Sequence, residues 1–129
     1  MAKYAELIPN FLTFVKINTR SDPQSTSIPS SDRETEFLNQ LKDRLTKMGL
    51  KDVHTNEQSA YVFATLPGNV DKSVPTVGFI SHIDTADFNA ENIQPQIVEN
   101  YDGHSVIKLD EKGEYTLDPK VFPSLKKYA

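Results

Sequence analysis

The residues best suited to chemistry are His82 and Asp84, which stand two positions apart in the segment SHIDT. Side chains two residues apart in a strand point to the same face, so these two would lie together if strand geometry continued through them. One imidazole nitrogen could then bind a metal ion while the carboxylate holds the other nitrogen, which fixes the tautomer and raises the basicity of the ring. The pattern therefore predicts His82 as a metal ligand and Asp84 as its orienting carboxylate.

A plain structural role for this pair stays open, because His-x-Asp is a short pattern that recurs by chance. His82 would then be a histidine at the end of a strand with a local hydrogen-bond partner. The other histidines are interpreted as surface residues, since His54 follows a Lys-Asp pair and His104 follows a turn signal. Asp87 and Glu91 could join His82 in a weak surface metal site, but acidic loop residues are usually solvated. We leave both out of the predicted site.

The segment that carries the pair is predicted to be a buried strand over residues 76–82, with the sequence TVGFISH. A continuous apolar run is typical of a strand covered on both faces, as in the sheet of an α/β domain. Open α/β sheets bind ligands at the carboxyl ends of their strands, which is where His82 would lie. Gly78 within the run favours close approach of another backbone, although it could equally accommodate packing.

Two amphipathic helices are expected before this strand. The first is expected to end near Asn18, with Pro9 in its opening turn. Its apolar stripe consists of Tyr4, Leu7, Ile8, Phe11, Leu12 and Val15. The second is expected to begin at Ser31, with Glu34 completing a capping box, and to stop at Gly49. Its stripe consists of Phe37, Leu38, Leu41, Leu45 and Met48.

The other segments are predicted to be loops and short strands, which places the chain in the α/β class. Residues 19–30 are polar and contain two prolines, so they are predicted to form a loop. Short strands are expected at residues 53–55 and 60–66. The pair Asp102-Gly103 favours a hairpin turn and predicts a β-hairpin between residues 96–100 and 105–109. The expected fold is two helices, strands of a mixed sheet and a C-terminal β-hairpin region.

Composition narrows the possible partners and metal ligands. The chain has 129 residues and a formal net charge of -4, without a basic stripe, so neither nucleic acid nor an anionic membrane is an expected partner. Cysteine is absent, so any metal must be held by histidine and carboxylates. No secretory leader and no apolar run long enough to span a bilayer are recognisable, so the expected location is the cytoplasm.

Four segments resemble a known family of zinc-dependent peptidases. They are GFISHIDTAD at residues 78–87, PQIVENY at 95–101, LPGNV at 66–70 and LIPNFLTFVKINT at 7–19. They resemble the N-terminal part of a family that comprises aminopeptidases, carboxypeptidases and deacylases, and the resemblance runs from about Lys3 to the last residue. The His-x-Asp core is common to the whole family. The wording ISHIDTAD and the PQIVENY segment resemble its cytoplasmic bacterial tripeptide aminopeptidases in particular.

The resemblance implies zinc-dependent hydrolysis that releases the N-terminal amino acid from tripeptides, with two zinc ions in the intact active site. By that resemblance His82 binds one zinc, and Asp84 orients it and supports catalysis. The family's remaining ligands and its general-base Glu come from later sequence. Residues 1–129 would therefore be the N-terminal segment of the catalytic domain, with one metal ligand and no activity alone, because a catalytic zinc needs about three protein ligands. No substrate-binding residue can be assigned.

Two other interpretations stay open. The chain could be a non-catalytic binding or assembly module on the same scaffold, or it could belong to a related carboxypeptidase or deacylase. The expected partner is a tripeptide substrate. A sheet edge without a neighbouring strand could also let the isolated chain self-associate.

Overall fold

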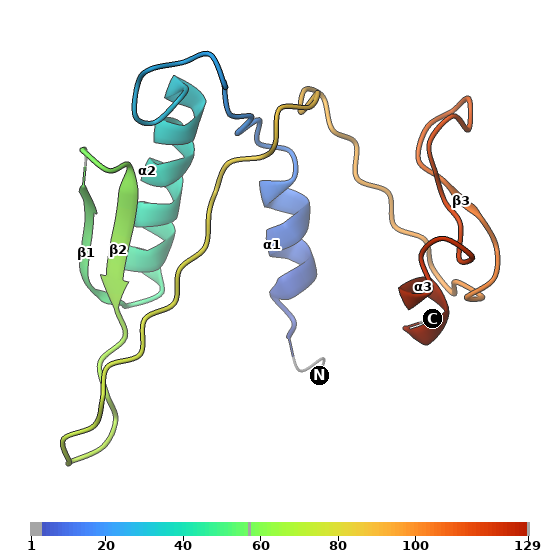
Figure 1. Ribbon diagram of the computed structural model, residues 1–129. Helices are drawn as coiled ribbons and strands as arrows, with labels where there is room; N and C mark the ends of the chain where they lie inside the picture. Colours follow the sequence, from blue (N-terminus) through green and yellow to red (C-terminus); the bar gives the residue numbers. More distant parts are fainter. Residues whose placement is uncertain (1–3, 57, 129) are drawn as a thin grey trace. The chain divides into compact units, whose positions relative to one another are not determined.

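The computed structural model describes residues 4–56 and 58–128 (Figure 1). Lys3 and Ala129, the limits of the sequence resemblance, lie outside them. The chain divides into two compact units, one up to Pro95 and one from Gln96 onward. The described residues form three helices and two small antiparallel sheets, which confirms the predicted α/β class. None of these helices is both long and apolar enough to cross a membrane.

The first unit holds most of the regular structure. It contains helix α1 (Leu7–Phe14), helix α2 (Asp32–Lys47), strand β1 (Lys51–Asn56) and strand β2 (Tyr61–Thr65). The two strands form an antiparallel hairpin that lies against α2 (Figure 1). Alternate residues of both strands are half-buried, as expected for a sheet with one face on a helix. The strands predicted at residues 53–55 and 60–66 are therefore confirmed.

Helix α2 has the predicted limits, but its N-terminal cap differs from the predicted capping box. Ser31 has the extended backbone of an N-cap residue, and Gly49 follows the helix with a φ of 83°. The Ser31 hydroxyl makes no capping bond, and its oxygen is buried without a partner among the described residues. The Glu34 carboxylate instead accepts the backbone N–H of Ser30 at 2.9 Å and the Ser30 hydroxyl at 2.8 Å. The reciprocal box is thus replaced by one carboxylate that reaches one residue further back.

Helix α1 is shorter than predicted, because it ends at Phe14 instead of near Asn18. Beyond Phe14 the backbone tightens, because the N–H of Ile17 donates to the carbonyl of Phe14 at 3.0 Å, three residues back instead of the helical four. Pro9 lies in the first turn, as predicted, where its missing N–H costs nothing. The apolar stripe of α1 is mostly exposed in the described structure. The contact with α2 is made instead by Phe14, which lies outside the predicted stripe and whose ring meets the Phe37 ring edge-on at 5.4 Å.

The predicted buried strand over residues 76–82 does not form in the part of the chain that the structure describes. The segment runs beside no strand partner, and Val77, Phe79 and Ile80 are 71%, 96% and 82% exposed. A strand is defined by ladder hydrogen bonds to a neighbour, and the described residues supply no such neighbour here. The nearest backbone pairing is an isolated parallel bridge between Arg20 and Thr85.

The second unit holds a short hairpin, but at a different place from the predicted one. Strand β3 (Ile107–Lys108) pairs with strand β4 (Thr116–Leu117), and helix α3 (Ser124–Lys127) follows. The pair Asp102-Gly103 does form a turn, with φ of 74° at Gly103. However, the Asp102 carboxylate accepts the N–H groups of His104 at 2.8 Å and Ser105 at 2.7 Å. Since this local turn uses those donors, the predicted pairing of residues 96–100 with 105–109 is wrong.

The Asp102 turn gives a prediction about pH. The Ser105 hydroxyl, together with the N–H groups of Ser105 and His104, lowers the pKa of Asp102 from 3.8 to about 2. A depressed folded-state pKa means that the turn is fully stabilised above pH 3.8 and loses this stabilisation as the pH falls through about 2. We expect a carboxyl NMR titration to place the Asp102 pKa near 2, and Ser105→Ala to raise it partway because one donor is lost. An Asp102 titration that is the same in both proteins would contradict this assignment.

Candidate functional site

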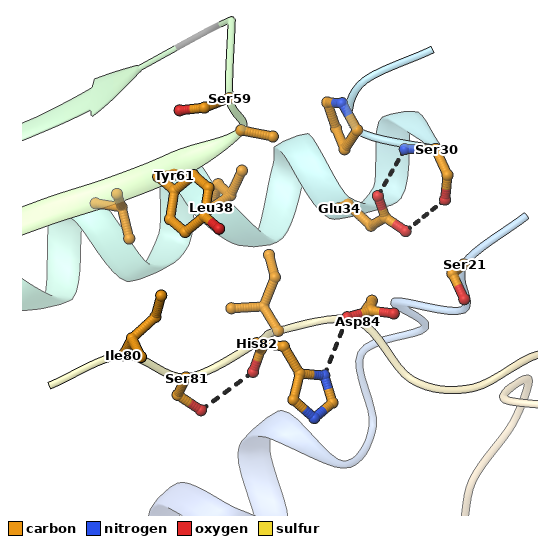
Figure 2. Close-up of a pocket in the computed structure, with 14 residues that line it drawn as sticks. Ser21, Ser30, Glu34, Leu38, Ser59, Tyr61, Ile80, Ser81, His82 and Asp84 are labelled. Carbon is orange, nitrogen blue, oxygen red and sulfur yellow. Dashed lines mark hydrogen bonds and ion pairs between the residues drawn. The ribbon is translucent and has the colours of Figure 1, made fainter. Parts of the chain in front are cut away.

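His82 and Asp84 lie at an open pocket of about 450 Å³ in the first unit (Figure 2). The start of α2 contributes Glu34 and Leu38 to the wall, and the start of β2 contributes Tyr61. The segment that carries the predicted site forms the opposite side of the pocket in Figure 2. The pocket thus joins the predicted residues to the loop and helix start that precede them in sequence.

The structure brings the two predicted site residues into direct contact. The Nδ1 atom of His82 lies 3.0 Å from Oδ1 of Asp84, and Figure 2 shows the other ring nitrogen pointing away from the carboxylate. That nitrogen, Nε2, has no hydrogen-bond partner within the described ranges. The His82 side chain is 82% exposed and that of Asp84 is 41% exposed. When Nδ1 carries the proton and donates it to Asp84, the lone pair of Nε2 is available to a metal.

A second set of contacts holds the backbone just after Asp84, and sequence reasoning missed it. The N–H of Thr85 donates to the carbonyl of Thr19 at 3.0 Å, and the N–H of Ser21 donates to the carbonyl of Thr85 at 3.1 Å. The Arg20 guanidinium binds Asp87, with Nε at 2.7 Å from Oδ1 and Nη2 in contact with the same oxygen. Arg20 and Asp87 are 67 positions apart, so no local pattern could have linked them.

The residues present fit one metal ligand and do not make a complete metal centre. No cluster of three or more His, Cys, Asp or Glu side chains in the described ranges is arranged to hold a metal ion. A catalytic zinc takes about three protein ligands, whereas this pocket offers the Nε2 atom of His82 and the carboxylate that orients it. Glu34 also lines the pocket, but Ser30 occupies both of its carboxylate oxygens. The donor set therefore suits a shared centre completed by other residues.

The other candidate residues are exposed or pair with arginine side chains. His54 is exposed, stacks on Phe63 at 5.2 Å and pairs with the Asp52 carbonyl at 2.7 Å. His104 is also exposed, which confirms the surface interpretation of both histidines. Glu91 lies 3.9 Å from the Arg33 guanidinium, and neither it nor Asp87 contacts His82. No group of three metal-ligating side chains that includes them is present among the described residues.

Comparison with known proteins shows which proteins the sequence resembles. No family model matches the chain. The chain is 56% identical over 128 residues to a peptidase T from Latilactobacillus sakei, covering 99% of this chain and 31% of that protein. It is 55% identical over 130 residues to a peptidase T from Ligilactobacillus salivarius, covering 99% of this chain and 32% of the relative.

A peptidase T from Enterococcus faecalis shows 54% identity over 125 residues, covering 97% of this chain and 31% of the relative. The chain thus spans about a third of the length of the curated relatives it matches. These alignments are more than half identical and cover nearly the whole chain, which confirms the resemblance found in the four sequence segments. The chain is thus similar, along nearly its whole length, to about one third of each of these peptidase T proteins.

Proposed function

We propose that this chain is part of a cytoplasmic, zinc-dependent aminopeptidase that releases the N-terminal amino acid from tripeptides. Similarity to peptidase T supports the hydrolase and peptidase class. The observation that carries the chemistry is the 3.0 Å contact between His82 and Asp84, which leaves Nε2 of His82 without a partner among the residues that the structure describes. An exposed imidazole that is oriented by a carboxylate is the arrangement of a metal-binding histidine.

In this proposal His82 holds one of two zinc ions through Nε2. Asp84 accepts the Nδ1 proton in a hydrogen bond, which selects the tautomer whose Nε2 lone pair is free and increases its basicity. Zinc in such a centre acts as a Lewis acid toward the scissile carbonyl and toward the attacking water. Asp84 is half-exposed, and the N–H of the next residue, Thr85, is bonded to the carbonyl of Thr19, so Asp84 can hold the imidazole in a constant direction.

The proposal also accounts for the incomplete donor set. His82 supplies one ligand, while a catalytic zinc needs about three protein ligands, so residues 1–129 alone should not hydrolyse peptides. The other ligands and the general base would have to be supplied by residues outside this chain. The alternatives are a non-catalytic binding module and a carboxypeptidase or deacylase of the same scaffold, and the same assay distinguishes them.

The test is a hydrolysis assay with the full-length gene product and three related substrates: a tripeptide, its N-acetylated form and its C-terminal amide. We expect release of the N-terminal residue from the tripeptide and its amide but not from the acetylated peptide, because recognition requires the free amino group. A chelator should abolish the reaction and added zinc should restore it.

Three results would contradict the proposal in different ways. Release of the C-terminal residue would identify a carboxypeptidase, and removal of the acetyl group would identify a deacylase. Absence of any hydrolysis with zinc present would favour the binding module.

A further inference from the structure

We propose that Arg20 and Asp87 form a clamp that positions the His82–Asp84 pair, so that both are positioning residues for the metal site. This inference rests on the proposed function, because it assigns the clamp a role in metal binding. The clamp consists of the Arg20–Asp87 ion pair and the backbone bonds that join Thr19 and Ser21 to Thr85.

The backbone bonds fix the residue that directly follows Asp84. Thr85 donates its N–H to Thr19 and accepts the N–H of Ser21, so both of its backbone polar groups are used. The Ser21 hydroxyl donates to the same Thr85 carbonyl at 3.1 Å. Thr19 is buried, with 3% of its surface exposed, and therefore provides a fixed point for the bridge. These bonds fix the backbone next to Asp84, whereas no strand partner among the described residues holds residues 76–82.

The ion pair adds a second link between the two segments, after Thr85 in the sequence. Both Nε and Nη2 of Arg20 donate to Oδ1 of Asp87, which is three residues beyond Asp84. Charge-assisted bonds from two guanidinium N–H groups restrict direction as well as distance. A lysine has one point charge on a flexible stem and cannot reproduce this fork. The clamp thus places ordered residues on the C-terminal side of the His82–Asp84 contact.

His82 needs such indirect support because little else holds it. Its side chain is 82% exposed, and its one ring contact within the described residues is the bond to Asp84. If the backbone of Asp84 moves, the imidazole loses the partner that sets its direction and tautomer. Loosening the clamp should therefore weaken metal binding without touching the ligand itself.

The chain contains a matched control for the ion pair. Arg33 and Glu91 lie in the same unit, but they approach only to 3.9 Å and their side chains are 55% and 66% exposed. Such a solvated pair contributes little to order, so Arg33→Gln removes one guanidinium without loosening Thr85. Arg20→Gln removes the same charge from the clamp. The net charge of the two variants is identical.

The first measurement uses the full-length gene product without bound metal. We expect Arg20→Gln and Asp87→Asn to accelerate amide hydrogen exchange at Thr85 and Ser21 by about 5-fold, the effect of losing a half-exposed ion pair. Arg33→Gln should leave both rates unchanged. The exchange of amides in α2 should be the same in all variants, which separates a local loosening from general destabilisation.

The second measurement uses the full-length gene product and zinc affinity from competition with a chelator. Loss of an orienting partner typically costs 10- to 100-fold in metal affinity, and we expect Arg20→Gln to weaken zinc binding by about 10-fold. Arg33→Gln should bind zinc normally. The charge-exchanged double variant, Arg20→Asp with Asp87→Arg, should recover part of the affinity that Arg20→Gln loses.

Equal exchange rates and equal zinc affinities in Arg20→Gln and Arg33→Gln would overturn the clamp. His82→Ala separates this failure from failure of the proposed function. If His82→Ala weakens zinc binding but Arg20→Gln does not, the clamp alone is wrong. If His82→Ala leaves zinc binding unchanged, His82 is not a ligand and both proposals fall.

Discussion

Replacing His82 with alanine in the full-length gene product should remove bound zinc and lower kcat/KM for a tripeptide by more than about 100-fold, beyond the cost of losing an orienting partner. Among the described residues, His82 is the one histidine that lines the pocket, and its Nε2 atom has no hydrogen-bond partner there. Alanine deletes the ligand and leaves the other elements of the first unit in place. Elemental analysis of the purified protein gives the metal content, and steady-state kinetics give the rate.

Two further variants make the His82 result specific. Asp84→Asn keeps an oxygen near Nδ1 but loses the charge, so zinc affinity should fall by about 10- to 100-fold and lie between wild type and His82→Ala. His104→Ala removes an exposed histidine of the second unit and should change neither quantity. Normal zinc content and normal hydrolysis in His82→Ala would show that the His82–Asp84 contact has only a structural role.

The His82–Asp84 contact was predictable from sequence because its geometry is local. In an extended backbone, residues two positions apart place their side chains on the same side. The structure keeps Nδ1 of His82 3.0 Å from Oδ1 of Asp84, although no sheet forms there among the described residues. Helix α2 was predictable for a similar reason, since its stripe, its N-cap at Ser31 and Gly49 beyond its end all act within one segment. The stripe of α1 has the same helical period, yet the helix ends at Phe14, where the N–H of Ile17 bonds three residues back, a local change that the apolar spacing does not reveal.

Sequence reasoning missed one feature that depends on a partner distant in the chain and one that depends on a local side-chain bond. The Arg20–Asp87 pair joins residues separated by 67 positions, and a single arginine in a polar loop has no pattern that identifies its carboxylate. At Asp102-Gly103 the turn itself was predictable. However, the Asp102 carboxylate accepts the N–H groups of His104 and Ser105, which excludes the predicted pairing of residues 96–100 with 105–109.

Residues 76–82 show the same limit for strands. Their apolar run indicates a segment that requires cover on both faces. A strand also needs a neighbouring strand to form its hydrogen-bond ladder, and none pairs with this segment among the described residues. Exposed Val77, Phe79 and Ile80 are the consequence. Self-association of the isolated chain through an unpaired edge stays a prediction, and sedimentation over a range of concentrations is its direct measurement.

Phe37→Ala should destabilise the first unit by about 3–5 kcal/mol, the usual cost of removing a large aromatic side chain from a core. Phe37 and Leu38 are the buried hydrophobic residues of the described structure, each 6% exposed. Phe37 also receives the edge-on contact of Phe14, over whose ring the Arg44 guanidinium lies at 5.3 Å. Because the core is small, truncation of this ring should loosen α1 together with α2. Urea unfolding of the 129-residue chain, followed by far-ultraviolet circular dichroism, measures the change in free energy.

Phe79→Ala is the matched control, because it deletes the same ring from a position that is 96% exposed. Removing apolar surface that is already in water forfeits neither burial nor packing, so the free energy of unfolding of the isolated chain should change by less than about 0.5 kcal/mol. Equal losses in the two variants would mean that residues 76–82 are buried as the apolar run predicts, and the exposed course of this segment would then be wrong. A large loss in Phe37→Ala alone would instead place the folding energy of the first unit in the contact between α1, α2 and the β1–β2 hairpin.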